Sequence, residues 1–157
     1  MRRTQPTILA LLFLSGGGIT YLCLQLLFRS GRALPRLPWT SAPLLLFLAI
    51  VLFLTAFNVS RRLEELKKSK EKKTQSQYKP INPIFLARLV LLAKSAAHAG
   101  SLLGGIYAGV FLGYLVDLPN SDFIWNSIFD AFSALLVAIG GYVLERVLTI
   151  KDDGKAI

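Results

Sequence analysis

The sequence predicts an all-α integral membrane protein, a bundle of four antiparallel transmembrane helices with both termini in the cytoplasm. Of 157 residues, 54% are hydrophobic and 17% are charged, whereas a soluble domain has about a quarter charged residues. The apolar residues gather into four long runs, and most Lys and Arg lie on one side of these runs. A chain of this length is expected to form a single domain that contains all four helices.

The first two helices are predicted at about 7–28 and 41–60. The run at 8–28 has Gln25 as its one strongly polar side chain and is long enough to cross a hydrocarbon core of about 30 Å. It exceeds the roughly 7–15 apolar residues of a signal peptide, so we expect an uncleaved anchor. The glycine-rich stretch at 15–18 lacks the Gly-Lys-Ser/Thr ending of a phosphate-binding loop.

The third and fourth helices are predicted at 83–117 and 123–149. Asn82 followed by Pro83 is typical of a helix start. A helix from there to the end of the third run is about 50 Å long at 1.5 Å per residue, roughly 20 Å more than the hydrocarbon core. We therefore expect its first dozen residues to project on the cytoplasmic side.

The distribution of Lys and Arg predicts the orientation. Thirteen of these residues fall in the N-terminus, the connection at 61–82 and the C-terminal tail, whereas three fall in the first opposite hairpin. Positive residues concentrate on the cytoplasmic side of the plasma membrane. The net charge of +9 is thus mainly an orientation signal, and we expect no nucleic-acid partner.

The connection at 61–82 is predicted to be a basic cytoplasmic loop. Its first residues pair Arg61 with Glu65 and Glu64 with Lys68, a spacing that supports a continuing helix. The loop either only fixes orientation or also binds anionic lipid headgroups, which gain about 1 kcal/mol per Lys or Arg near the surface.

Six ionisable residues are candidates for pairing or function: Arg29, Arg88, Lys94, His98, Asp130 and Glu145. Lys94 is expected near the inner membrane boundary, where long cationic side chains reach water. His98 lies one turn deeper, where a hydrogen-bonded interior histidine is favoured over a proton relay or metal ligand. Charges within membranes usually pair, so we expect Glu145 to contact Lys94 or Arg88, and Asp130 to pair with Arg29.

Small residues recur every fourth position along the predicted third helix. One stripe holds Ala93, Ala97, Ser101, Gly105, Gly109 and Gly113, and a second holds Ala96, Gly100, Gly104 and Ala108. Small residues at this spacing let helix backbones approach closely. Two stripes on one helix can serve two neighbours, within one chain or across a dimer. Ala134, Ala138, Gly140 and Gly141 offer a matching surface on the fourth helix.

The stretch NPIFLARLVLLAKSAAHAGSLLGGIYAG at 82–109 resembles the central signature of an actinobacterial membrane protein family known as domain of unknown function 3180. The resemblance rests on Pro83, Ala87, Arg88, Ala93, Lys94, Ser95, Gly105, Tyr107 and Gly109. ALPRLPW at 33–39 and GGYVLER at 140–146 are similar to its flanking features. The resemblance implies a small multi-pass membrane protein with no established activity and no catalytic residues to assign. It also allows Arg88 and Lys94 a role beyond positioning the helix.

Two functional hypotheses follow. The first is a structural or accessory membrane protein that acts through helix packing and the basic loop, with anionic lipids and a membrane protein partner or a second copy of itself as partners. The alternative is a small transporter or channel subunit that uses His98 and Asp130. The sequence contains no nucleophile and base set, metal-ligand spacing or phosphate loop, so we expect no enzyme, no cofactor and no metal.

Overall fold

The computed structural model of the chain describes residues 4–31, 40–71, 83–118 and 123–149. The described part consists of four helices, α1 (Pro6–Arg29), α2 (Ser41–Glu71), α3 (Pro83–Asp117) and α4 (Phe123–Thr149). Each is long and apolar enough to cross a membrane. The prediction of an all-helical chain with four helices of membrane-spanning length and composition is thereby confirmed.

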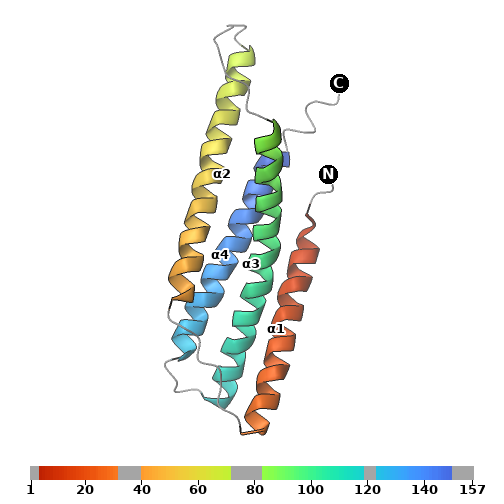
Figure 1. Cartoon of the computed structure of the whole chain (residues 1–157), viewed down its shortest axis with the longest axis vertical. Helices are drawn as coiled ribbons and strands as arrows, with labels where there is room; N and C mark the ends of the chain where they lie inside the picture. The colour runs from red at the N-terminus through yellow and green to blue at the C-terminus, as the bar shows by residue number, and fades with distance from the viewer. Residues whose placement is uncertain (1–3, 32–39, 72–82, 119–122, 150–157) are drawn as a thin grey trace.

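The helix α2 is longer than the span predicted at 41–60. Its apolar part ends at Arg61, yet the helix continues to Glu71 and extends past the other helices (Figure 1). The sequence spacing of Arg61 with Glu65 and of Glu64 with Lys68 favoured a helix that continues past the apolar span. At the boundary, the Arg61 guanidinium lies over the Phe57 ring, 4.3 Å from its centroid, a cation–π contact.

The helices form an open row rather than a closed bundle. Extensive contacts join α1 to α3, α3 to α4, and α4 to α2, so the order across the row is α1, α3, α4, α2 (Figure 1). Successive helices run in opposite directions, and both chain termini lie at one end. We call that end the terminal end, and the end where α1 finishes and α4 begins the hairpin end.

Small side chains form the centre of the row, where α3 meets α4. Ala93 and Ala97 of α3 and Ala134 of α4 are fully buried. The contact between α4 and α2 adds larger side chains, including Leu144 and Leu52. The inner helices thus pack closely, and α2 attaches to α4 through ordinary aliphatic contacts.

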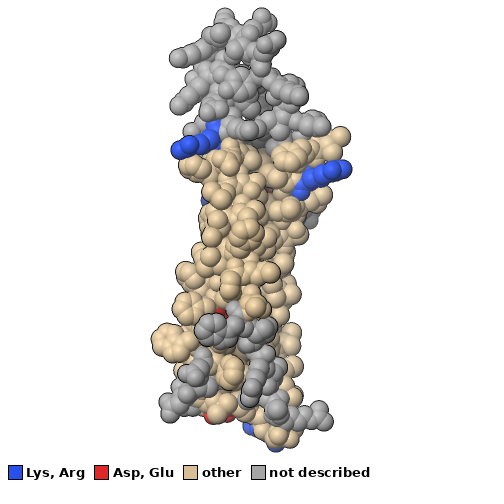
Figure 2. Space-filling model, turned by 60° about the vertical axis from the view of Figure 1, so that its left-hand side comes forward, with Lys and Arg blue, Asp and Glu red and all other residues tan. Residues whose placement is uncertain are grey.

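The two edge helices are largely exposed, as expected for helices that face lipid. In the apolar span of α1, 11% of the residues are buried, against 50% in that of α4. Leu14 on α1 and Leu44 on α2 are 69% and 70% exposed. On the face in Figure 2, Lys and Arg side chains lie towards the ends and mostly uncharged residues cover the length between them, the pattern of a membrane-spanning surface.

Candidate functional site

Glycines of α3 form its contact with α1. A Cβ atom on Gly105 would collide with the Phe13 carbonyl, and one on Gly109 with the Gly17 carbonyl. A Cβ on Gly113 would lie 3.0 Å from Leu24 Cδ1. Backbone rather than side chain is met at the first two positions, so α1 and α3 are closest there.

Glycines also form the contact between α3 and α4. A Cβ on Gly100 would lie 2.6 Å from the Ala138 nitrogen, and one on Gly141 would lie 2.6 Å from the Ala97 nitrogen. Gly104 lies between both neighbours, because its Cβ position is 3.4 Å from the Phe13 ring of α1 and 3.6 Å from Leu135 of α4. The five glycines predicted for packing all lie at helix contacts within one chain.

The stripe of small residues changes partner along α3. Four residues exceed one helical turn of 3.6 residues by about 40°, so a stripe with this spacing winds around the helix. At Ala97 it faces α4 at Gly141, whereas at Gly105 it faces α1. Sequence reasoning missed Gly16 and Gly17, which are the α1 side of this contact. The glycine-rich stretch at 15–18 was the feature of the sequence that could have identified them.

At the terminal end, Glu145 of α4 binds the start of α1. Its Oε1 accepts hydrogen bonds from the Thr4 backbone nitrogen at 3.0 Å and from Thr4 Oγ1 at 2.7 Å. Glu145 is 5% exposed and Thr4 is 8% exposed. A carboxylate at a helix N-terminus is stabilised by the helix dipole. Thr4 precedes the predicted first helix, and the sequence contained no signal for this partner. The contact of Glu145 with Lys94 or Arg88 stays a prediction.

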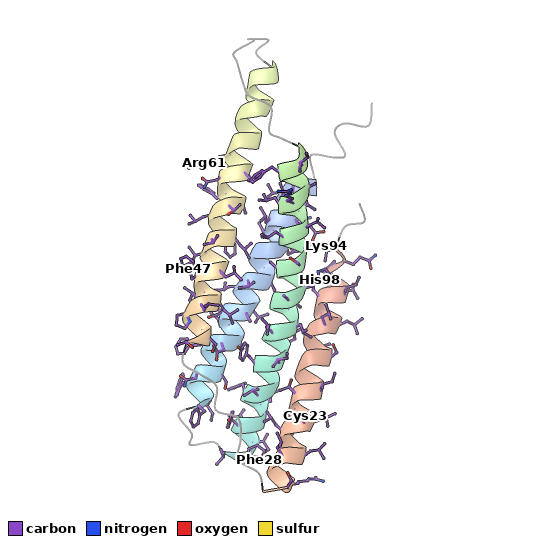
Figure 3. The ribbon with its side chains drawn as sticks, viewed as in Figure 1. Cys23, Phe28, Phe47, Arg61, Lys94 and His98 are labelled. Carbon is purple, nitrogen blue, oxygen red and sulfur yellow. The ribbon has the colours of Figure 1, made fainter. Side chains whose placement is uncertain are left out.

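Lys94 and His98 lie on the side of α3 that faces α1. Ser101, seven residues after Lys94 and three after His98, shares this side of the helix. Its Oγ donates a 2.6 Å hydrogen bond to the Leu9 carbonyl of α1. The Lys94 and His98 side chains are half-buried, and Arg88 is exposed. His98 Nδ1 is 2.7 Å from the Lys94 carbonyl oxygen, which can only accept, so Nδ1 donates. Figure 3 shows the two residues one turn apart.

Asp130 lies near the hairpin end and is 2% exposed. Its Oδ1 accepts a 2.8 Å hydrogen bond from Ser41 Oγ, at the first residue of α2. Tyr107 of α3 interacts with both Ser41 and Asp130. The structure does not bring Asp130 and Arg29 together as expected, because Asp130 faces α2 while α1 lies at the other edge of the row. Arg29 is exposed at the end of α1.

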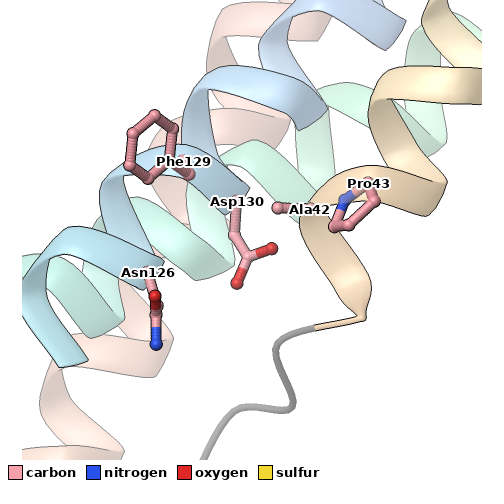
Figure 4. Close-up of a pocket in the computed structure, with 5 residues that line it drawn as sticks. All are labelled: Ala42, Pro43, Asn126, Phe129 and Asp130. Carbon is pink, nitrogen blue, oxygen red and sulfur yellow. The ribbon is translucent and has the colours of Figure 1, made fainter.

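A pocket of about 250 Å³ opens beside Asp130. It is lined by two residues of the first turn of α2 and three of α4: Ala42, Pro43, Asn126, Phe129 and Asp130. Figure 4 shows Asp130 and Asn126, one turn apart on α4, pointing to the same side. The pocket is therefore lined by a buried carboxylate, an amide and an aromatic side chain.

A second carboxylate at the hairpin end lies outside this pocket. Asp117, the last residue of α3, is exposed, and its Oδ2 accepts a 3.1 Å hydrogen bond from Gln25 Nε2 of α1. Within the described ranges, no group of three or more His, Cys, Asp or Glu could hold a metal ion.

His98 and Asp130 lie far apart along the helix axes and face opposite edges of the row. Gly141 of α4 is level with Ala97 of α3, next to His98. Asp130 is eleven residues before Gly141, or roughly 16 Å along the helix axis at 1.5 Å per residue. His98 also faces α1, whereas Asp130 faces α2. The structure does not bring these two residues into one site.

A sequence model of the family described as "Protein of unknown function (DUF3180)" matches residues 9–152. The chain belongs to the DUF3180 family. The resemblance in the 82–109 stretch is thereby confirmed, and the match extends across all four helices of this DUF3180 protein. Neither curated proteins nor solved structures gave a match.

Proposed function

We propose that this DUF3180 protein is a structural or accessory component of the plasma membrane that binds another membrane protein through an edge of its helical row. The observation that carries this proposal is the open row itself. Both α1 and α2 pack extensively on one inner helix each, which leaves most of each edge helix available for contact. Helices in membranes associate through packing, so these edges are suited to binding a further transmembrane helix.

The proposed orientation places the terminal end in the cytoplasm. Both termini and the polar extension of α2 lie at this end. The sequence concentrates Lys and Arg in the same segments, as the positive-inside rule requires for N-in and C-in. The basic segment at 61–82 would then bind anionic headgroups beside the partner, with about 1 kcal/mol per Lys or Arg.

Affinity purification from native membranes after crosslinking tests the proposal. Leu14→Trp and Leu44→Trp place the same bulky change on opposite edges, at side chains of equal exposure. We expect one variant to lose a partner that the other retains, with equal insertion and expression. A further variant replaces the five lysines between 67 and 73 with Gln and tests the basic segment. Purification of the same partners with all three variants, or of no partner with wild type, would count against the accessory function.

The alternative is a small transporter or channel subunit. One observation favours it: Asp130 is a carboxylate buried within a membrane-length helix, and such residues often mark ion or substrate pathways. The separation of His98 from Asp130 argues against one pathway that uses both. Flux through reconstituted vesicles that is abolished by both His98→Ala and Asp130→Asn would favour this alternative over the accessory function.

A further inference from the structure

The pocket at the hairpin end combines a negative group with mostly apolar walls. Asp130 is 2% exposed, and the described groups next to it are neutral: the Ser41 hydroxyl donates a hydrogen bond to it and Tyr107 lies nearby. Among the described residues, no Lys or Arg forms an ion pair with Asp130, whose hydrogen-bond donor is the Ser41 hydroxyl. Placing a carboxylate in an apolar site is costly unless a cation or a proton neutralises it. The pocket beside Asp130 offers space for such a cation.

We propose that this pocket binds a small ammonium group, either primary or methylated. Asp130 supplies the opposite charge, and the Asn126 side-chain oxygen supplies an acceptor one turn away on α4. The Phe129 side chain also lines the pocket, and because its ring points away from the Asp130 carboxylate (Figure 4), it contributes apolar wall. These three groups match the charge, the N–H donors and the apolar carbons of an organic ammonium ion.

The size and polarity of the site favour an organic cation. Its volume of about 250 Å³ is several times the roughly 30 Å³ share of one water molecule, so it holds a group such as ethanolamine or tetramethylammonium. Ca²⁺ takes about six to eight oxygen ligands, whereas Ala42, Pro43 and Phe129 make most of this wall apolar. An organic ammonium group, which needs fewer oxygen ligands and carries apolar carbons, therefore fits the wall better than a metal ion.

The depth of the pocket allows two sources of the ammonium group. Asp130 lies seven residues into α4, about 10 Å along its axis, and Ser41 is the first residue of α2. This level is close to the membrane boundary, where both lipid headgroups and dissolved amines are present. The inference does not depend on the accessory function, since a bound ammonium group requires no protein partner.

Calorimetric titration of the purified full-length chain in dodecyl maltoside tests the inference. The probes are ethanolamine and tetramethylammonium chloride, with sodium chloride at equal ionic strength as the salt control. We expect saturable binding by wild type and at least about tenfold weaker binding by Asp130→Asn, which keeps the shape but removes the charge. Asp117→Asn is the matched control, because it removes an exposed carboxylate at the same end of the molecule. It should bind as wild type does.

A second variant guards against misfolding of Asp130→Asn. Phe129 is 59% exposed, so Phe129→Ala should preserve the fold while removing part of the apolar wall of the pocket, and we expect weaker binding of tetramethylammonium. Native mass spectrometry distinguishes the sources. Retention of phosphatidylethanolamine over phosphatidylglycerol by wild type and Asp117→Asn, with displacement by ethanolamine, identifies a lipid headgroup. Ethanolamine binding without lipid retention identifies a free amine.

Three results would overturn the inference. They are no saturable binding of either probe to wild type, equal binding by wild type and folded Asp130→Asn, and equal loss of binding in Asp130→Asn and Asp117→Asn. The last would show that net charge rather than the pocket attracts the cation. Partner purification is a separate measurement, so failure of this site leaves the accessory function to be judged by its own experiment.

Discussion

Glu145 and Thr4 are 141 positions apart in sequence and share two hydrogen bonds at the terminal end of the row. The carboxylate belongs to α4 and its donors to the residues that precede α1, so the pair ties an edge helix to the opposite inner helix. A second polar contact to α1 near this end is the hydrogen bond from Ser101 to the Leu9 carbonyl. Together they hold the start of α1 against the two inner helices.

Thr4→Val is expected to loosen the start of α1. The change keeps the backbone donor but removes the buried hydroxyl, and it should lower the free energy of unfolding by about 1 kcal/mol. Ser15→Ala is the matched control, since Ser15 is exposed and its hydroxyl bonds only within α1, to the Leu12 carbonyl. Thermal unfolding in detergent and proteolysis near residue 6 would measure the effect. Equal behaviour of the two variants would show that the bond to Glu145 contributes no stability.

Gly100→Ala and Gly105→Ala are expected to destabilise the row. Each added methyl meets backbone of a neighbouring helix, which cannot rotate away, and such overpacking costs about 1–3 kcal/mol. Gly18→Ala is the control, because nothing lies within 4 Å of its Cβ position. Ala favours a helix over Gly by up to about 1 kcal/mol, so this variant should be neutral or more stable. Unfolding in detergent would rank the three variants, and an unstable Gly18→Ala would contradict the assigned helix contacts.

The N-in and C-in orientation predicts which engineered cysteines react with a membrane-impermeant thiol reagent added outside intact cells. In a Cys23→Ala background, a cysteine at position 120 should be labelled, whereas cysteines at positions 70 and 155 should be labelled only after the cells are opened. The physical reason is the excess of Lys and Arg in the segments around positions 70 and 155. Labelling of position 70 in intact cells would reverse the orientation.

The sequence was sufficient to predict that there are four helices, because their signals are local. Four apolar runs of membrane length predicted four helices, and the Pro83 start and the spacing of charges after Arg61 depend on a few neighbouring residues. The small residues of α3 also predicted close packing, since spacing along one helix is a local property. The sequence did not show whether a given glycine contacts α1 or α4, because the stripe turns by about 40° every four residues and the contact depends on where the neighbouring helices lie.

The order of the helices across the row was decided by the tertiary structure. Nothing in the runs themselves states that α1 lies beside α3 and α2 beside α4, and charge pairing alone suggested Arg29 for Asp130. That order follows from which surfaces fit, with the glycines of α1 and α3 in backbone contact and the larger aliphatic residues of α2 against α4. It separated His98 from Asp130 and placed Ser41 beside the Asp130 carboxylate. Residues distant in sequence meet only when whole helix faces pack, and this is why the pocket could not be predicted from the sequence.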